Sequence, residues 1–207
     1  MKIATGSKEL DDFFGGYNGD EFTLIYGKAG TGKTTMAMLA TLMQAKNNKK
    51  VIYIDSENGF AIDRFKLFTE NIEEALKHIV ILKPKSFDEQ HNMIMNLPKT
   101  KVSLIIVDTL GIFYRKKLTE DYKLANEMIV AQLRKLKEFT KSKVPVLIIN
   151  QVYSRMNDTV NPVGGDLVKN HCKKIIRLEN NQKRILILEK PEIKRTYFEI
   201  AGDGIKL

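Results

Sequence analysis

Residues 27–34 read GKAGTGKT and combine the residue types that hold phosphate groups. Three glycines let the backbone turn tightly, so that its N–H groups can face an anion. The lysine can reach the β- and γ-phosphates, and the following threonine can give its hydroxyl to Mg²⁺. The motif lies between an expected strand and an expected helix, as a P-loop requires. The expected nucleotide-binding residues are Gly27, Lys28, Ala29, Gly30, Thr31, Gly32, Lys33, Thr34 and Thr35.

Acidic residues follow two further apolar runs. Asp108 ends SLIIVD, and Glu57 lies just past VIYID. In a P-loop fold the first carboxylate can hold Mg²⁺ through water beside Thr34, and the second can orient the attacking water. A strand-end cap and a solvated loop residue are the simpler alternatives. The sequence therefore predicts Lys33 and Glu57 as catalytic residues, and Thr34 with Asp108 as the Mg²⁺ site.

A polar pair ends the apolar run VPVLIINQVYS at residues 144–154. In an open α/β sheet, ligands bind beyond the carboxyl ends of the strands. We therefore expect the Gln151 amide to meet the γ-phosphate. Asn150 is expected to hold the end of its strand by hydrogen bonding.

Strand and helix patterns alternate along the chain, which predicts an α/β fold with a mostly parallel central sheet and helices on both faces. Three closely spaced runs near the end predict an antiparallel C-terminal edge. The expected strands cover residues 21–26, 51–55, 79–82, 102–108, 146–149, 175–178, 184–189 and 196–200. The expected helices cover 34–46, 63–68, 72–77, a segment from Ser86 to Pro98 opened by a capping box, and 120–140.

Composition is that of an ordinary soluble domain, and we expect residues 1–207 to form one core domain. Apolar residues make up 43% and charged residues 29%. The longest apolar runs, about six residues, are far shorter than the roughly 20 that span a bilayer. No signal peptide is evident, and Cys172 is the sole cysteine. These features favour a cytoplasmic protein without a membrane partner.

The formal net charge of +9 favours a polyanionic partner. One basic stretch, GIFYRKKL, follows Asp108, and a second segment, YSRMNDTVNPVGGD, follows Gln151. On loops, such residues could contact phosphates, and a tyrosine could stack on a base. A solvated loop with an inward tyrosine is the alternative. The expected nucleic-acid contacts are Tyr114, Arg115, Lys116 and Arg155.

Four stretches in this order, GKAGTGKT, YIDSEN, LIIVDT and IINQV, resemble the core of the RecA-type recombinases. The resemblance is to the archaeal and eukaryotic branch, runs from about Thr5 to the end, and includes PVGGDLVKN and FEIAGDGI. It implies a RecA-like P-loop ATPase core with ATP and Mg²⁺. It also implies that Glu57 is the catalytic glutamate, Asp108 the Mg²⁺ aspartate and Gln151 the γ-phosphate sensor.

Archaeal accessory paralogues of the main recombinase are the members that the sequence resembles most. The resemblance implies a recombination mediator in DNA repair with weak DNA-dependent ATPase activity at most. Its implied partners are DNA, above all single-stranded DNA, the main archaeal recombinase and a Holliday-junction resolvase. The phosphate motif starts at residue 27, and we find neither a helix-hairpin-helix domain nor the aromatic-x-x-Ala linker. Stable filaments and strand exchange are therefore not expected.

Two other functions fit a P-loop protein. A signalling ATPase of the circadian-clock KaiC type shares much of this motif set and would act through protein partners. A nucleotide kinase is disfavoured because the chain has no arginine-rich lid segment. The three histidines show no metal-ligand spacing.

Overall fold

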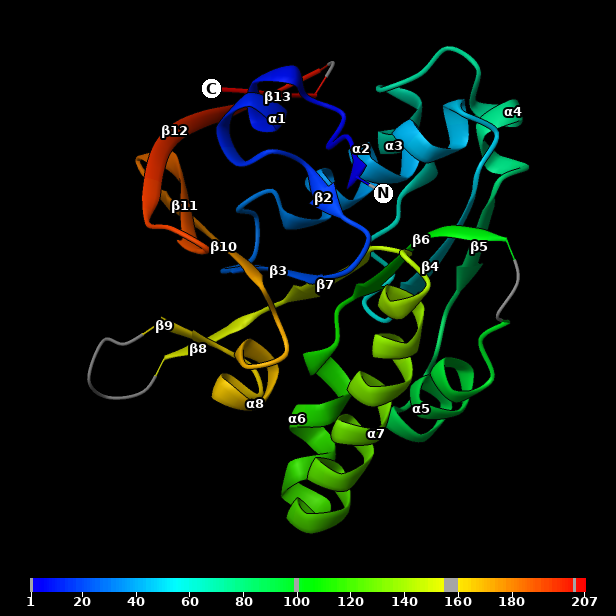
Figure 1. Cartoon of the computed structure of the whole chain (residues 1–207). Helices are drawn as coiled ribbons and strands as arrows, with labels where there is room; N and C mark the ends of the chain where they lie inside the picture. Colours follow the sequence, from blue (N-terminus) through cyan, green and yellow to red (C-terminus); the bar gives the residue numbers. More distant parts are fainter. Residues whose placement is uncertain (1, 99–100, 155–159, 203) are drawn as a thin grey trace.

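A nine-stranded mixed sheet forms the centre of the computed structural model (Figure 1), with the order β13-β12-β11-β10-β3-β7-β6-β4-β5. The structure describes residues 2–98, 101–154, 160–202 and 204–207. Six strands run parallel: β3 (Phe22–Gly27), β4 (Lys50–Asp55), β5 (Ile79–Leu82), β6 (Val102–Asp108), β7 (Val146–Asn150) and β10 (Lys174–Asn181). The antiparallel edge consists of β11 (Lys183–Lys190), β12 (Lys194–Ala201) and β13 (Gly204–Lys206). The predicted mostly parallel sheet with an antiparallel C-terminal edge is confirmed.

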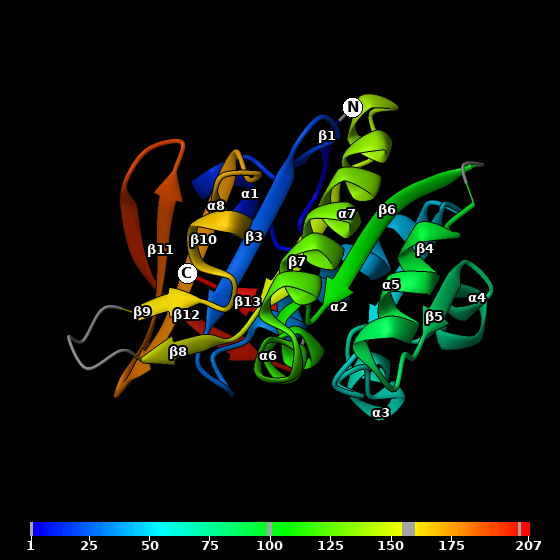
Figure 2. The same ribbon diagram turned by 90° about the horizontal axis from the view of Figure 1, so that it is seen from below.

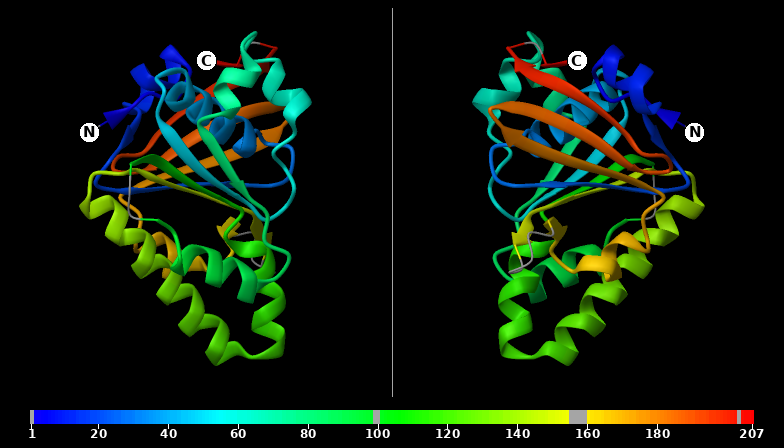
Figure 3. Two further views of the ribbon diagram at one scale, coloured as in Figure 1. Left: turned by 90° about the vertical axis from the view of Figure 1, so that its right-hand side faces the viewer. Right: turned by 90° about the vertical axis from the view of Figure 1, so that its left-hand side faces the viewer.

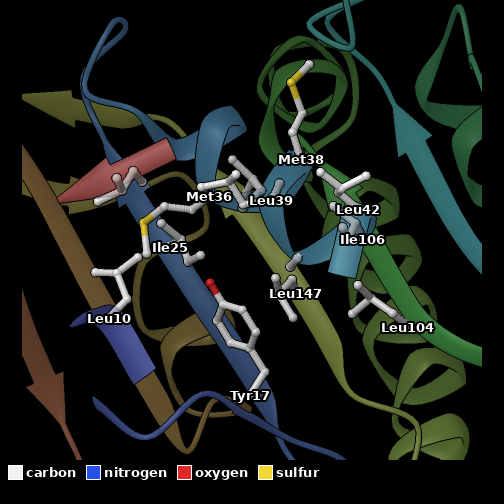
Figure 4. Close-up of a cluster of buried hydrophobic side chains, with 14 of the residues drawn as sticks. Leu10, Tyr17, Ile25, Met36, Met38, Leu39, Leu42, Leu104, Ile106 and Leu147 are labelled. Atoms are coloured by element: carbon white, nitrogen blue, oxygen red, sulfur yellow. The ribbon is translucent and has the colours of Figure 1, made fainter. Parts of the chain in front are cut away.

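Central strands are apolar on both sides because each face of the sheet is covered by helices. Along β6, Leu104 and Ile106 belong to one buried cluster, while Ile105 and Val107 belong to the other. Figure 4 shows the first cluster, where Met36 and Leu39 lie among side chains of the central strands. Both helical layers flank the twisted sheet in Figure 3.

One helical layer contains α1 (Lys8–Phe14), α2 (Lys33–Lys46), α3 (Ile62–Lys66) and α4 (Ile72–Leu76). The opposite layer contains α5 (Phe87–Met95), α6 (Gly111–Glu120), α7 (Tyr122–Lys141) and α8 (Gly165–Lys169). Two small antiparallel pairs complete the described fold: β1 (Lys2–Ile3) with β2 (Tyr17–Asn18), and β8 (Val152–Ser154) with β9 (Val160–Pro162).

The helix boundaries follow local capping chemistry. The Ser86 Oγ accepts a hydrogen bond from the Glu89 backbone N–H, as the predicted capping box requires, although the Glu89 carboxylate accepts from the backbone of Lys85. The helix expected over 120–140 begins instead at Tyr122, because Asp121 caps it by accepting from the backbone N–H of Leu124.

The stretch GIFYRKKL, expected as a loop, forms α6. Its side chains explain why: Tyr114 and Leu118 are four residues apart, so both face the same side and pack against the core on that face. The first helical residue, Gly111, lies buried under the end of β7. None of the described helices is long and apolar enough to cross a membrane.

Candidate nucleotide and nucleic-acid sites

The glycines of the phosphate motif meet distinct steric demands between β3 and α2. A Cβ on Gly27 would lie 2.2 Å from the Leu178 carbonyl oxygen, since β3 and β10 approach closely there. Gly30 and Gly32 have φ values of +74° and +104°, which L side chains rarely adopt. The loop therefore needs glycine at all three positions. It leads directly into the first turn of α2.

Lys33 lies at the start of α2 and is only 7% exposed. Its Nζ donates to the Lys28 carbonyl oxygen at 2.7 Å, so the ammonium folds back over the loop. Burial lowers the pKa of Lys33, and the negative charges of Asp108 and Glu57 act in the opposite direction. A phosphate group in the loop would supply the direct anionic partner that this buried ammonium lacks among the described residues.

Asp108 ends β6 beside α2 and is 2% exposed. The Tyr53 hydroxyl donates to its Oδ2 at 2.6 Å, and the Thr34 side chain also bonds this carboxylate. Burial raises the pKa of Asp108 to about 6, although both hydrogen bonds act to lower it. A divalent cation beside the carboxylate would favour its ionised form.

The donor set at this point fits Mg²⁺. Thr34 and Asp108 present a hydroxyl and a carboxylate, the hard oxygen ligands that this ion takes, and it commonly completes its shell with waters and phosphate oxygens. No cluster of three or more His, Cys, Asp or Glu suited to a metal ion occurs within the described residues. Mg²⁺ that is bound together with a nucleotide usually takes only one or two of its ligands from the protein.

The strand ends of β4, β6 and β7 bring Glu57, Thr109 and Gln151 together. The Thr109 hydroxyl donates to Glu57 Oε1 at 2.8 Å. The Gln151 Nε2 lies 2.8 and 2.9 Å from the two carboxylate oxygens. The structure thus places the expected sensor amide on the expected catalytic carboxylate, and it adds Thr109, which sequence reasoning missed.

Further hydrogen bonds fix the loop that carries Glu57. The buried Asp55 carboxylate accepts from the Gly59 and Phe60 backbone N–H groups at 2.8 and 3.2 Å. Beyond the loop, a fully buried amide connects it to two helices, since the Ser56 Oγ lies 2.9 Å from Gln90 Oε1 and Gln90 Nε2 donates to Gln132 at 3.0 Å. The sequence signal that could have revealed this series of hydrogen bonds is a glutamine at an apolar position of α5 and another at an apolar position of α7.

Arg64 is a second side chain that sequence reasoning missed. It lies on α3, shortly after the Glu57 loop, and its guanidinium donates to the Thr35 hydroxyl in the first turn of the P-loop helix. A lone arginine in a short helix gives no spacing signal, so only the fold brings it to the phosphate motif.

Asn150 holds the end of β7, as expected. It is fully buried, donates from Nδ2 to the Val163 carbonyl at 2.7 Å, and accepts from the Gln151 backbone N–H at 3.0 Å. A Cβ on Gly111 would lie 2.4 Å from its Oδ1. The close approach sets the start of α6 directly beside the strand end that carries Gln151.

Two of the expected nucleic-acid residues lie next to Gln151. Arg115 and Lys116 are exposed on α6, and with Gln151 they line a hollow of about 320 Å³. The structure contradicts a stacking role for Tyr114, because its ring is 3% exposed and its hydroxyl donates to Asn126 at 2.8 Å. Tyr114 lies four residues before Leu118, on the same face of α6, so its ring points into the core. Arg155 lies outside the described residues.

Comparisons with known proteins agree with this geometry. The Rad51 family profile matches residues 1–206. The DNA repair and recombination protein RadB of Thermococcus kodakarensis is 33% identical over 221 residues, covering 99% of this chain and 98% of the relative. A RadB of Methanococcus maripaludis is 36% identical over 197 residues, covering 89% and 91%. A crystal structure of the RadB recombinase superposes with a TM-score of 0.80 at 31% identity, covering 98% of both chains.

These matches give no support to the alternative of a KaiC-type signalling ATPase. They agree instead with the order of the four strand-end motifs and with the sheet that positions them. The chain therefore belongs to the Rad51 family, within its RadB branch.

Proposed function

We propose that this protein is an ATP-binding accessory factor in DNA repair and homologous recombination, in which the nucleotide controls contact with DNA. The observation that carries the proposal is the double position of Gln151. Its amide holds the Glu57 carboxylate, and the same residue lines the hollow that Arg115 and Lys116 share. One side chain therefore belongs to both candidate sites.

At the nucleotide site, Lys33 and the loop N–H groups would bind the phosphates, while Thr34 and Asp108 would hold Mg²⁺, which neutralises phosphate charge. Glu57 would orient the attacking water. Its carboxylate already accepts bonds from Thr109 and Gln151, which leaves less of its hydrogen-bonding capacity for water. This arrangement supports slow ATP hydrolysis at most.

At the nucleic-acid site, Arg115 and Lys116 would contact the phosphates of single-stranded DNA. The relatives named DNA repair and recombination proteins support this assignment. Within the same proposal, the main archaeal recombinase and a Holliday-junction resolvase are the expected protein partners. Pull-down of a full-length recombinase with and without ATP tests the first of these.

The decisive experiment is Gln151→Ala, with single-stranded DNA affinity measured with and without ATP. The variant should bind ATP as the wild type does, while the effect of ATP on DNA affinity becomes smaller. Asn92→Ala removes an exposed amide from α5, outside both candidate sites, and serves as the control. Lys33→Ala should lose nucleotide affinity with the fold intact. Equal ATP dependence in Gln151→Ala and wild type would refute the coupling.

A further inference from the structure

The amino ends of three neighbouring strands form a basic hollow that the nucleotide site does not use. β7, β6 and β4 are adjacent and parallel, so the turns that lead into them lie side by side. Those turns, at residues 48–50, 101–103 and 142–144, line a hollow of about 430 Å³. In Figure 2, β6 begins near one end of the molecule, whereas α6 lies near the other.

Four ammonium groups surround this hollow. Lys49, Lys50, Lys101 and Lys143 line it, and none of the other described residues that line it is acidic. Within the described part of the chain, Lys143 is the one member that forms an ion pair, with Asp20 at 3.6 Å. We call these four residues the amino-end lysine cluster. The other three cations face solvent without a carboxylate partner among the described residues.

Two of the lysines occupy backbone positions that favour a different residue type. Lys101 and Lys143 have φ values of +47° and +64°, in the left-handed region that glycine adopts with less strain. Lys143 also follows the last turn of α7, where glycine is the usual residue. Turn geometry alone therefore does not account for a lysine at either position.

We propose that the amino-end lysine cluster binds the phosphate backbone of a second nucleic-acid segment. Neighbouring strands lie about 4.8 Å apart, so three strands span roughly 10 Å, which matches a few successive phosphates of one strand. β6 is seven residues long, so the cluster lies roughly 20 Å from the Arg115 side of the sheet. That separation suits a different segment from the one beside α6.

The lining favours nucleic acid over an acidic protein. Val102 and Val144 are its two apolar side chains, and both are only half-buried. Protein interfaces usually centre on a larger apolar anchor, whereas sequence-independent phosphate binding needs only flexible point charges such as lysine. A protein with phosphate contacts at both ends of the sheet could bridge two strands, which is a property beyond the proposed coupling of ATP to one DNA site.

The test replaces Lys49, Lys50 and Lys101 together by glutamine, which removes charge and keeps side-chain length. The matched control carries Lys8→Gln, Lys66→Gln and Lys183→Gln, which change the net charge equally at distant exposed sites. Affinity for an oligothymidine is measured across salt concentrations. Bridging is measured as capture of a labelled oligothymidine by protein on an immobilised one. Thermal melting confirms that both variants are folded.

In the cluster variant, the slope of log K against log salt concentration should become smaller in magnitude by about 2, because each single-strand phosphate that a lysine no longer neutralises contributes roughly 0.7. The same variant should lose bridging. The control should retain bridging and most of the slope. Equal behaviour of the two variants would overturn the proposal. So would loss of binding to a polyglutamate peptide with DNA binding unchanged, which would indicate an acidic protein. The double variant Arg115→Gln, Lys116→Gln in the same assays tests the α6 site separately. The proposals for the two sites can therefore be refuted independently.

Discussion

Within the proposed function, removing one buried hydroxyl should move the pH range of Mg²⁺ and nucleotide binding. Tyr53 donates to Asp108 at 2.6 Å in a fully buried setting, and this bond stabilises the ionised carboxylate. A buried hydrogen bond to a charged group contributes about 1.5–3 kcal/mol. At 1.36 kcal/mol per pKa unit, Tyr53→Phe should raise the pKa of Asp108 by about one to two units.

The sign of the effect follows from the titration of Asp108. Its pKa of about 6 in the folded protein leaves the carboxylate mostly ionised at neutral pH. After the substitution the midpoint would lie at roughly 7 to 8, so about half or more of the carboxyl groups would be protonated near pH 7. A protonated carboxyl is a poor partner for Mg²⁺. Affinity at neutral pH should therefore fall about twofold to tenfold and should recover as the pH rises.

The assay is titration of a fluorescent ATP analogue with Mg²⁺ across pH, with the midpoint of the pH profile as the readout. Tyr26→Phe is the matched control, because Tyr26 is also fully buried and donates to a carboxylate, that of Glu189, away from the expected Mg²⁺ site. Its profile should coincide with that of the wild type. Identical midpoints for the two variants would refute the reasoning about Asp108.

Two further predictions concern stability. Burial raises the pKa of Asp108 from 3.8 to about 6, so stability is lost as the pH rises from about 4 to about 6, and the full penalty is present at neutral pH. Asp108→Asn should therefore stabilise the nucleotide-free protein at neutral pH by about 2–3 kcal/mol, and it should abolish the Mg²⁺ dependence of nucleotide binding. Thermal melting should show this gain at pH 7 and little of it near pH 4; a gain independent of pH would contradict the assignment. Gly111→Ala should destabilise the fold by about 1–3 kcal/mol, since its Cβ would meet the buried Asn150 and Val163. Gly202→Ala, where a Cβ meets nothing within 4 Å, should be close to neutral in chemical denaturation, and equal losses for both glycines would exclude a steric cause.

Short sequence patterns predicted those parts of the candidate site that depend only on neighbouring residues in the chain. The phosphate motif and the polar residues that end β4, β6 and β7 follow from short stretches, because carboxyl ends of parallel strands meet at one edge. The burial of Tyr114 does not follow from such a stretch, since it depends on α6 starting beneath Asn150, a contact between segments about 40 residues apart in sequence. The Gln90 to Gln132 hydrogen bond likewise joins two helices that share no local pattern.

The contact between Gln151 and Glu57 has a kinetic consequence. The Gln151 amide nitrogen has two N–H donors, and its contacts with both Glu57 oxygens at 2.8 and 2.9 Å leave it less donor capacity for a phosphate. Within the proposed function, the γ-phosphate of ATP and the catalytic glutamate therefore compete for the same amide. Turnover would rise with the fraction of time that the amide spends away from Glu57. In a slow ATPase of this kind, the hydrolysis rate would set how long the protein stays in its ATP-bound form.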